Sequence, residues 1–175
     1  MLRLRPYEKY DAKYIADWFE NEHIFHQWCA NEYNNYPLTG DDINAYYERH
    51  EAENNNFKFT AFNETGIVGH IAMRFTDFEK TELRFGFIAI DKKHRGKGLG
   101  KEMVLLALDY AFRILKAKIV NLGVFENNES AYRCYKSAGF KDAALLVPEQ
   151  YIIFGDVWKC RELEYKSEDY FRNSN

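Results

Sequence analysis

A basic, glycine-rich turn joins two apolar segments near the middle of the chain, and it restricts the possible folds more than any other feature. The turn, Arg95-Gly-Lys-Gly-Leu-Gly-Lys101, follows a strand-like run at 85–90 and leads directly into a helix-like run. Glycines at alternate positions let the backbone turn tightly and bring its N–H groups close to a bound group. The helix that follows directs its positive dipole end and unpaired amides at the same place. This order of elements predicts a cradle for a cofactor phosphate.

Two common phosphate-binding motifs do not match this turn. A Walker P-loop has a glycine five positions before its Gly-Lys-Ser/Thr, whereas Arg95 lies five positions before Gly100 and Glu102 follows Lys101. A dinucleotide fingerprint, G-x-G-x-x-G, needs its third glycine at the position that Lys101 occupies. A protein that binds ATP or NAD at this turn is therefore the weaker alternative, and the pattern that remains is Arg-x-x-Gly-x-Gly.

A second strand, turn and helix follow further along the chain. Residues 120–125 alternate as a strand does, and Asn127 and Asn128 come next as candidate helix N-caps. The run at 129–138 spaces its apolar residues as a helix does, and Gly139 stands where a C-terminal cap belongs.

Together the two segments resemble the acyl-CoA-binding motifs of the GNAT superfamily of N-acetyltransferases. Arg-x-x-Gly-x-Gly resembles its pyrophosphate loop, and Asn128-x-x-Ala131-x-x-x-Tyr135-x-x-x-Gly139-Phe140 resembles its second motif. The resemblance covers roughly residues 67–165 and looks closest to the ribosomal-protein acetyltransferase-like branch. It implies a single domain over residues 1–175 with an α/β (α+β) fold, in which helices flank a central, mixed, mostly antiparallel sheet of about seven strands.

The resemblance also implies acetyl-CoA as cosubstrate, with no metal. A backbone N–H within 88–90 would polarise the thioester carbonyl, and the Tyr135 hydroxyl would protonate the leaving thiolate. Asn128 would meet the pantetheine arm, and Arg95 and Lys97 would contact phosphate. Arg133 and Lys136 are further candidates for the adenosine 3′-phosphate. The full set implied for cofactor binding is Ile88, Ala89, Ile90, Arg95, Gly96, Lys97, Gly98, Leu99, Gly100, Lys101, Asn128, Ala131 and Tyr135.

The sequence leaves alternatives open for the base that activates the amine. An amine with a pKa near 10.4 lies about 3.4 units above neutral pH, which is roughly 4.6 kcal/mol of unfavourable protonation. Glu82 is the first candidate, because residues 82, 84, 86, 88 and 90 share one face of a regular strand. Some family members have a glutamate where this chain has Arg84, so Glu82 would lie one step further from the reacting carbon. A solvated carboxylate is the other interpretation of Glu82, and Glu126 is the alternative base.

Composition restricts the class of protein further. A net charge of −3 argues against nucleic-acid binding as the main activity. Three scattered cysteines give neither a disulfide framework nor a zinc-binding pair. The segment from Met1 to Pro6 lacks the long apolar run of a signal peptide or membrane span. We therefore expect a cytoplasmic protein with neither a membrane nor a nucleic-acid partner.

The other expected elements complete the architecture. The helix at 99–115 is apolar on most of its surface and is expected to be buried between layers. The last residues, Ser174 and Asn175, are expected to fray. The remaining expected elements are one or two helices within 11–31, a helix from 41, and strands at 2–5, 57–62, 67–75, 83–90, 143–147 and within 151–164.

The first third of the chain is rich in aromatic residues, and in the resembling family this region usually covers the acceptor. Its composition predicts a partly apolar pocket with polar edges. His23 and His26 lack the spacing of His-Glu-x-x-His, so they are expected at the edge of this pocket or against the core and not on a metal. His70 is expected to pack in a strand.

The function that follows is transfer of an acetyl group from acetyl-CoA to a primary amine, by direct attack in a ternary complex. The acceptor stays open among a protein N-terminus or peptide, a polyamine, an amino sugar, an amino acid and an antibiotic amine. A catalytically inactive module that binds or senses acyl-CoA is the alternative. A homodimer is compatible with the sequence, and a monomer is equally so.

Overall fold

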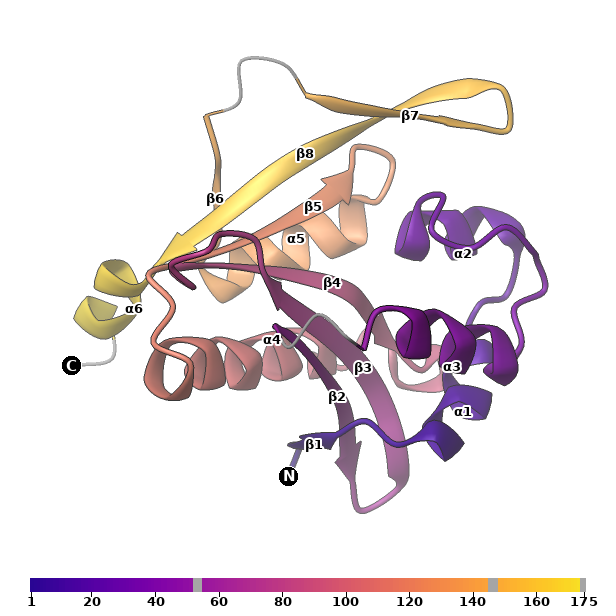
Figure 1. Ribbon diagram of the computed structural model, residues 1–175, viewed down its shortest axis with the longest axis horizontal. Helices are drawn as coiled ribbons and strands as arrows, with labels where there is room; N and C mark the ends of the chain where they lie inside the picture. The colour runs from indigo at the N-terminus through magenta and orange to yellow at the C-terminus, as the bar shows by residue number, and fades with distance from the viewer. Residues whose placement is uncertain (52–54, 145–147, 174–175) are drawn as a thin grey trace.

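A mixed sheet forms the centre of the molecule (Figure 1). The computed structural model describes residues 1–51, 55–144 and 148–173, and within them the sheet has eight strands. Neighbouring strands are antiparallel except β4 and β5, which are parallel. The predicted fold class is confirmed. The strands are, in sheet order, β1 (Arg3–Pro6), β2 (Asn56–Asn63), β3 (Gly66–Phe75), β4 (Glu82–Ile90), β5 (Ile119–Phe125), β8 (Asp156–Lys166) and β6 (Lys141–Asp142), with β7 (Glu149–Ile153) also paired to β8.

Three helices from the first third of the chain group together at one end of the sheet (Figure 1). They are α1 (Ala12–Ala16), α2 (Glu22–Cys29) and α3 (Gly40–Arg49). The side chain of Asn21 caps α2, and Thr39 forms a capping box with Asp42 at the start of α3. Ile15, Phe25 and Ile43 are fully buried between these helices and the sheet. The prediction of one or two helices within 11–31 is therefore confirmed as two.

The N-terminal strand is fixed to this layer by a buried carboxylate. Asp11 is the last residue of the short helix η1 (Lys9–Asp11). Its carboxylate accepts two hydrogen bonds from Arg5, at 2.8 and 2.7 Å. The Thr60 hydroxyl donates a third at 2.6 Å. Burial alone would raise the pKa of Asp11, but these bonds hold it below its ordinary value.

None of the described helices is long and apolar enough to cross a membrane.

The long helix covers one face of the sheet and is not enclosed between two layers, so that prediction is wrong. It consists of α4 (Leu99–Asp109) and a π-helical turn, η3 (Tyr110–Ile114). Met103 and Leu108 are buried against the strands, whereas Leu105 and Ile114 are 38% and 63% exposed. The apolar surface of this helix is thus wider than the face that it buries.

The second predicted helix lies where its sequence places it. In α5 (Glu129–Ala138), the Asn128 side chain accepts a hydrogen bond from the Ala131 amide, and Gly139 ends the helix with φ at 108°. A Cβ on Gly139 would also lie 2.8–2.9 Å from the Tyr165 ring, so only glycine fits there.

The C-terminal region differs from the predicted pattern. The segment expected as one strand within 151–164 is a hairpin of β7 and β8, which turns at Phe154 and Gly155, both with positive φ. The strand expected at 143–147 is β6 instead, and residues 145–147 lie outside the described residues. A last helix, α6 (Ser167–Asn173), was not predicted. The fraying expected of Ser174 and Asn175 also concerns residues outside the described ranges.

A bulge in β4 overturns the predicted strand face. Between the pairs His70–Ala89 and Ala72–Gly86, β3 advances by two residues and β4 by three. Phe87, which lies in the bulge, has a left-handed φ of 50°. Leu83 and Phe85 therefore face the same core as Ile88 and Ile90, whereas Phe87 and Ala89 face the N-terminal helices. Residues 82, 84 and 86 consequently do not share their face with 88 and 90.

Candidate active site

One cavity of about 1040 Å³ passes from the glycine turn to the N-terminal helices. Its path is opened by the two parallel strands, which pair from Glu82 to Arg84 of β4 and then separate (Figure 1). Because the strands diverge, side chains and backbone from both faces of the sheet line the same space. The cavity thus has a half beside α4 and α5 and a half beside α2 and α3.

Glycines shape the first half. Gly96 and Gly98 adopt left-handed φ values of 75° and 81°, and a side chain at either would meet no atom within 4 Å. Glycine is therefore required at both positions by the backbone conformation, and not by a lack of space for a side chain. Gly98 precedes the first residue of α4, whose opening amides have no acceptor within the helix. A Cβ on Gly100 would lie 3.3 Å from Cys134 Sγ, so glycine lets α4 approach α5 closely.

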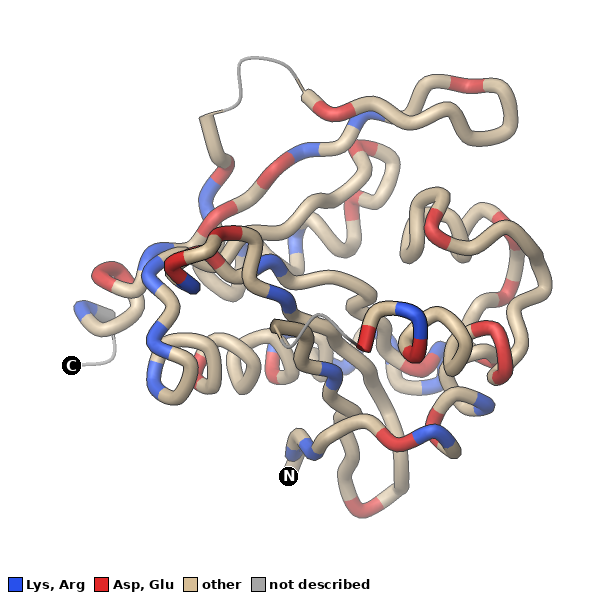
Figure 2. Tube along the Cα trace, viewed as in Figure 1, with Lys and Arg blue, Asp and Glu red and all other residues tan. Residues whose placement is uncertain are grey.

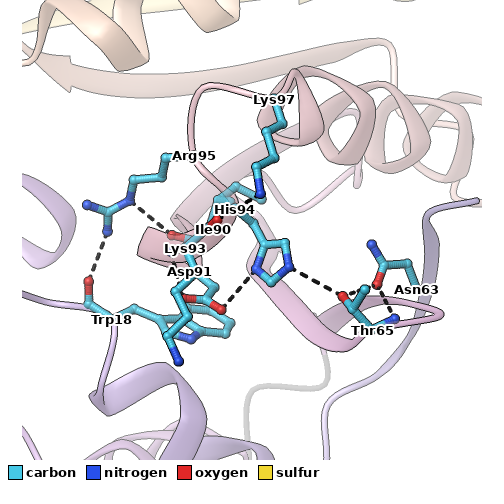
Figure 3. Close-up of polar contacts among 9 residues, drawn as sticks. All are labelled: Trp18, Asn63, Thr65, Ile90, Asp91, Lys93, His94, Arg95 and Lys97. Atoms are coloured by element: carbon cyan, nitrogen blue, oxygen red, sulfur yellow. Dashed lines mark hydrogen bonds and ion pairs between the residues drawn. The ribbon is translucent and has the colours of Figure 1, made fainter.

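A set of hydrogen bonds fixes the approach to this turn (Figure 3). Asp91 accepts from the Lys93 amide at 3.1 Å and lies 3.0 Å from Nδ1 of His94, which closes the short helix η2 (Lys92–His94). Nε2 of His94 lies 3.3 Å from the Thr65 hydroxyl, on the β2–β3 turn. The approach to the glycine turn is thereby held against the β2–β3 turn.

The basic side chains of the turn stabilise its shape. Arg95 donates to the carbonyl of Ile90 at 3.1 Å and to that of Trp18 at 2.9 Å (Figure 3). Lys97 donates to the Lys93 carbonyl at 3.0 Å. Gly96, Gly98, Gly100, Lys101 and Arg95 all line the cavity. Lys97 and Leu99, also expected to bind the cofactor, are not among the described residues that line it.

Helix α5 supplies the facing wall, where Asn128, Ala131 and Tyr135 line the cavity as the resemblance implies. Tyr135 is 8% exposed, and its burial raises the pKa of the phenol well above the ordinary value. A phenol in that state keeps its proton at neutral pH, so its O–H is available as a hydrogen-bond donor. Arg133 also lines the cavity, whereas Lys136 forms an ion pair with Asp142 at 2.7 Å and is not among the described lining residues.

The bulge stands where the two halves meet. Ile88, Ala89 and Ile90 all line the cavity. A bulge takes one residue out of the regular ladder, so a backbone N–H there is available to a ligand. This is the place where the resemblance puts the donor that polarises the thioester carbonyl.

Aromatic rings from the first third of the chain surround the second half. The rings of Trp28 and Tyr33 stack with centroids 5.6 Å apart. Phe87 lies 5.2 Å from Trp28 and 5.3 Å from Tyr46, between centroids. Trp28, Tyr46 and Phe87 line the cavity. The bulge residue is therefore part of the wall on this side.

The histidines singled out in the sequence contact other groups. His23 packs on the Trp158 ring with centroids 4.8 Å apart, and Nδ1 of His26 lies 2.7 Å from the Ala30 carbonyl oxygen. His70 is fully buried beside Tyr47, as expected of a packing residue. No three His, Cys, Asp or Glu side chains among the described residues gather as metal ligands.

Neither candidate base lies at the cavity. Glu82 and Glu126 are both exposed, and neither is among the described lining residues. Glu82 is misplaced because it starts β4, and the bulge separates its face from that of Ile88. Among the described residues, the acidic residue that lines the cavity is Glu32. Its carboxylate accepts a hydrogen bond from the Tyr46 hydroxyl at 3.1 Å.

Arg84 spans the strands beneath the second half. Its guanidinium donates to both oxygens of Glu162 on β8 and, at 3.0 Å, to the side-chain oxygen of Asn121 on β5. A Cβ on Gly123 would lie 2.9 Å from this guanidinium, so glycine leaves room for it. Arg84 therefore joins three strands where β4 and β5 begin to diverge.

Three charged residues of the second half, Glu32, Lys58 and Arg74, were not predicted from the sequence. Arg74 interrupts an otherwise apolar run in β3, and the alternation of that strand turns it away from Met73 and Phe75. That position was a usable signal. Glu32 stands in a loop after α2, and no local pattern distinguishes it.

Comparisons with known proteins agree with this geometry. A family model described as an acetyltransferase (GNAT) domain matches residues 1–141. The spermidine N(1)-acetyltransferase of Vibrio cholerae is 27% identical over 152 residues, covering 86% of this chain and 85% of that protein. A probable N-acetyltransferase of Bacillus subtilis, YjcK, is 31% identical over 169 residues, covering 91% and 90%.

Among solved structures, the Vibrio cholerae spermidine N-acetyltransferase in complex with CoA and spermine superimposes with a TM-score of 0.81. It is 25% identical, and the match covers 97% of this chain and 98% of that one. The predicted superfamily is confirmed, but an affiliation with the ribosomal-protein branch is not. This chain belongs to the GNAT family and is an acetyl-CoA-dependent N-acetyltransferase.

Proposed function

We propose that this enzyme acetylates the primary amine of a small molecule, by direct attack of the amine in a ternary complex. The observation that carries the proposal is the continuous cavity that joins the glycine turn to the aromatic half at the β4 bulge. It allows an amine in the aromatic half to reach an acyl group held in the other half. Relatives of this chain are spermidine and spermine N-acetyltransferases, whose acceptors are also small amines.

The residues of the first half fit acetyl-CoA. Left-handed glycines, the opening amides of α4 and the basic Lys101 suit the pyrophosphate, and the wall of α5 with Asn128 and Ala131 suits the pantetheine arm. When bound, acetyl-CoA supplies the activated acyl carbon. Arg95 acts on this site by holding the turn through Ile90 and Trp18.

Two groups of the protein would promote the transfer. A backbone N–H within 88–90 would stabilise negative charge on the carbonyl oxygen. As the C–N bond forms and the C–S bond breaks, Tyr135 would give its proton to the sulfur, and water would take the proton that the amine loses and return a proton to Tyr135. The base that receives the amine proton is not Glu82 in this proposal, because the Glu82 side chain is exposed and outside the described cavity lining.

Release of free CoA thiol from acetyl-CoA tests the proposal. The panel would contain polyamines, amino acids, amino sugars, aminoglycosides and short peptides with free N-termini. We expect release above the amine-free rate with one class of small amine. Tyr135→Phe should lower kcat by about 10²- to 10⁴-fold, the usual contribution of a general acid, without weakening acetyl-CoA binding.

Tyr132→Phe is the matched control, because Tyr132 lies on the same helix and hydrogen bonds with Asp142 at the surface. It should leave turnover unchanged. Tight acetyl-CoA binding with no thiol release from any amine would instead favour the sensing module. Release only with peptides would refute the small-molecule acceptor.

A homodimer and a cytoplasmic location stay predictions from the sequence.

A further inference from the structure

The second half of the cavity carries positive charge on three neighbouring strands. Lys58 of β2, Arg74 of β3 and Arg84 of β4 all line it, and Figure 2 shows basic positions on each of these strands. Arg74 and Arg84 occupy directly opposite positions in the β3–β4 register. Like charges opposite each other in a sheet are unfavourable unless negative charge compensates them. An anionic group is therefore favoured beside this pair.

Among the described residues, an ion pair compensates one of the two arginines. Arg84 is held by Glu162 and Asn121. Arg74 is exposed at the cavity, and none of the described ion pairs involves it. A planar guanidinium with open donors binds a carboxylate through two parallel hydrogen bonds. Arg74 thus presents a carboxylate site to whatever occupies this half.

One negative charge also lines this half of the cavity. Glu32 is the acidic residue among the described lining residues, and it is hydrogen bonded by Tyr46, whose ring packs on Phe87 of the bulge. Burial chiefly raises the pKa of Tyr46, Glu32 raises it further, and Arg74 lowers it. Glu32 is therefore connected, through the hydroxyl and ring of Tyr46, to Phe87 of the bulge, beside which an attacking amine stands.

We propose that the acceptor is a free amino acid, a primary amine that also carries a carboxylate. The inference rests on the proposed acetyl transfer to a small amine. Arg74 binds the carboxylate, Glu32 attracts the ammonium group before it loses its proton, and the rings of Trp28 and Tyr46 contact the apolar part between them. A polyamine would instead bring several positive charges to a cavity in which most of the charged lining residues, among those described, are basic.

Matched pairs of amines test this directly, because decarboxylation removes the anion and leaves the rest of the skeleton. The pairs are tyrosine and tyramine, phenylalanine and 2-phenylethylamine, and lysine and cadaverine. Tyrosine amide adds a form with the carboxylate blocked, and a dipeptide with N-terminal tyrosine separates a peptide acceptor from a free amino acid. We expect kcat/KM to be about 10- to 100-fold higher for the preferred amino acid than for its partner.

Arg74→Ala assigns that difference to one residue. It should raise KM for the preferred amino acid by about 10- to 100-fold while kcat changes by less than about threefold, and it should leave the decarboxylated partner unaffected. Arg172→Ala is the matched control, since Arg172 is a 74% exposed arginine on α6. The inference would be overturned if the enzyme used both members of every pair equally. It would also be overturned if the enzyme preferred the decarboxylated members, spermidine or the dipeptide.

A binding measurement keeps this result separate from the proposed function. If no amine is acetylated, the proposed transfer fails, and calorimetry on the CoA-saturated protein still measures the affinities of the paired ligands. Tighter binding of an amino acid than of its partner, lost in Arg74→Ala, would support the carboxylate site. Equal binding, or no binding of either member in any pair, would refute it.

Discussion

Replacing Gly98 with alanine isolates the backbone requirement of the cofactor turn. Gly98 has φ at 81°, and an added Cβ would meet no atom within 4 Å. The substitution therefore introduces no clash, and its cost is that of holding an L-residue in the left-handed region, about 1–2 kcal/mol. In the free protein the turn can relax and avoid part of this cost. With acetyl-CoA bound it must keep the left-handed shape, so the part of the cost that the free protein avoids, about 1 kcal/mol, appears in binding, and we expect the Kd to rise by about fivefold.

Gly155→Ala is a close control. Gly155 has φ at 82°, also with nothing within 4 Å of an added Cβ, but it lies in the turn between β7 and β8. Both variants should lose a similar small amount of stability, of the order of 1 kcal/mol, or about 2–4 °C in Tm. Only Gly98→Ala should weaken acetyl-CoA binding, measured by calorimetry. A Kd for Gly98→Ala within twofold of that for Gly155→Ala would refute the role assigned to the left-handed turn.

Three further predictions concern residues outside the turn. Arg84→Ala leaves the Glu162 carboxylate, which is 16% exposed, without its partner, and should lower the free energy of unfolding in urea by about 2 kcal/mol. Removing Glu162 as well should restore part of that loss. Strictly additive effects of the two substitutions would contradict the coupling. Burial lowers the pKa of His70 to about 4. Because the unfolded chain then binds the extra proton between about pH 4 and 6.5, stability should rise with pH in this window by about 3 kcal/mol. His70→Gln should flatten that dependence, and an unchanged slope would assign it to other groups. Glu82→Gln should leave kcat/KM within about twofold of the wild type; a tenfold loss would return Glu82 to the catalytic groups.

Local sequence determined the parts of the cofactor half that depend on neighbouring residues. The positive φ values of Gly96 and Gly98 and the caps of α5 at Asn128 and Gly139 are set within a few residues, so their patterns could be interpreted without the rest of the chain. Tyr135 lies at the cavity because a helix of known start places it there. Alternation located the central strands for the same reason.

Tertiary structure alone decided the rest. One extra residue at the β4 bulge reverses which side chains share a face, and it removed Glu82 from the site although the strand itself was predicted correctly. Arg95 donates to the carbonyl of Trp18, far away in the sequence, and so holds the turn against the N-terminal region. Glu32 and Arg74 come together at the cavity from a loop and a strand. Spacing along the chain carries no information about such distant partners, because only packing of the sheet against its helices brings them together.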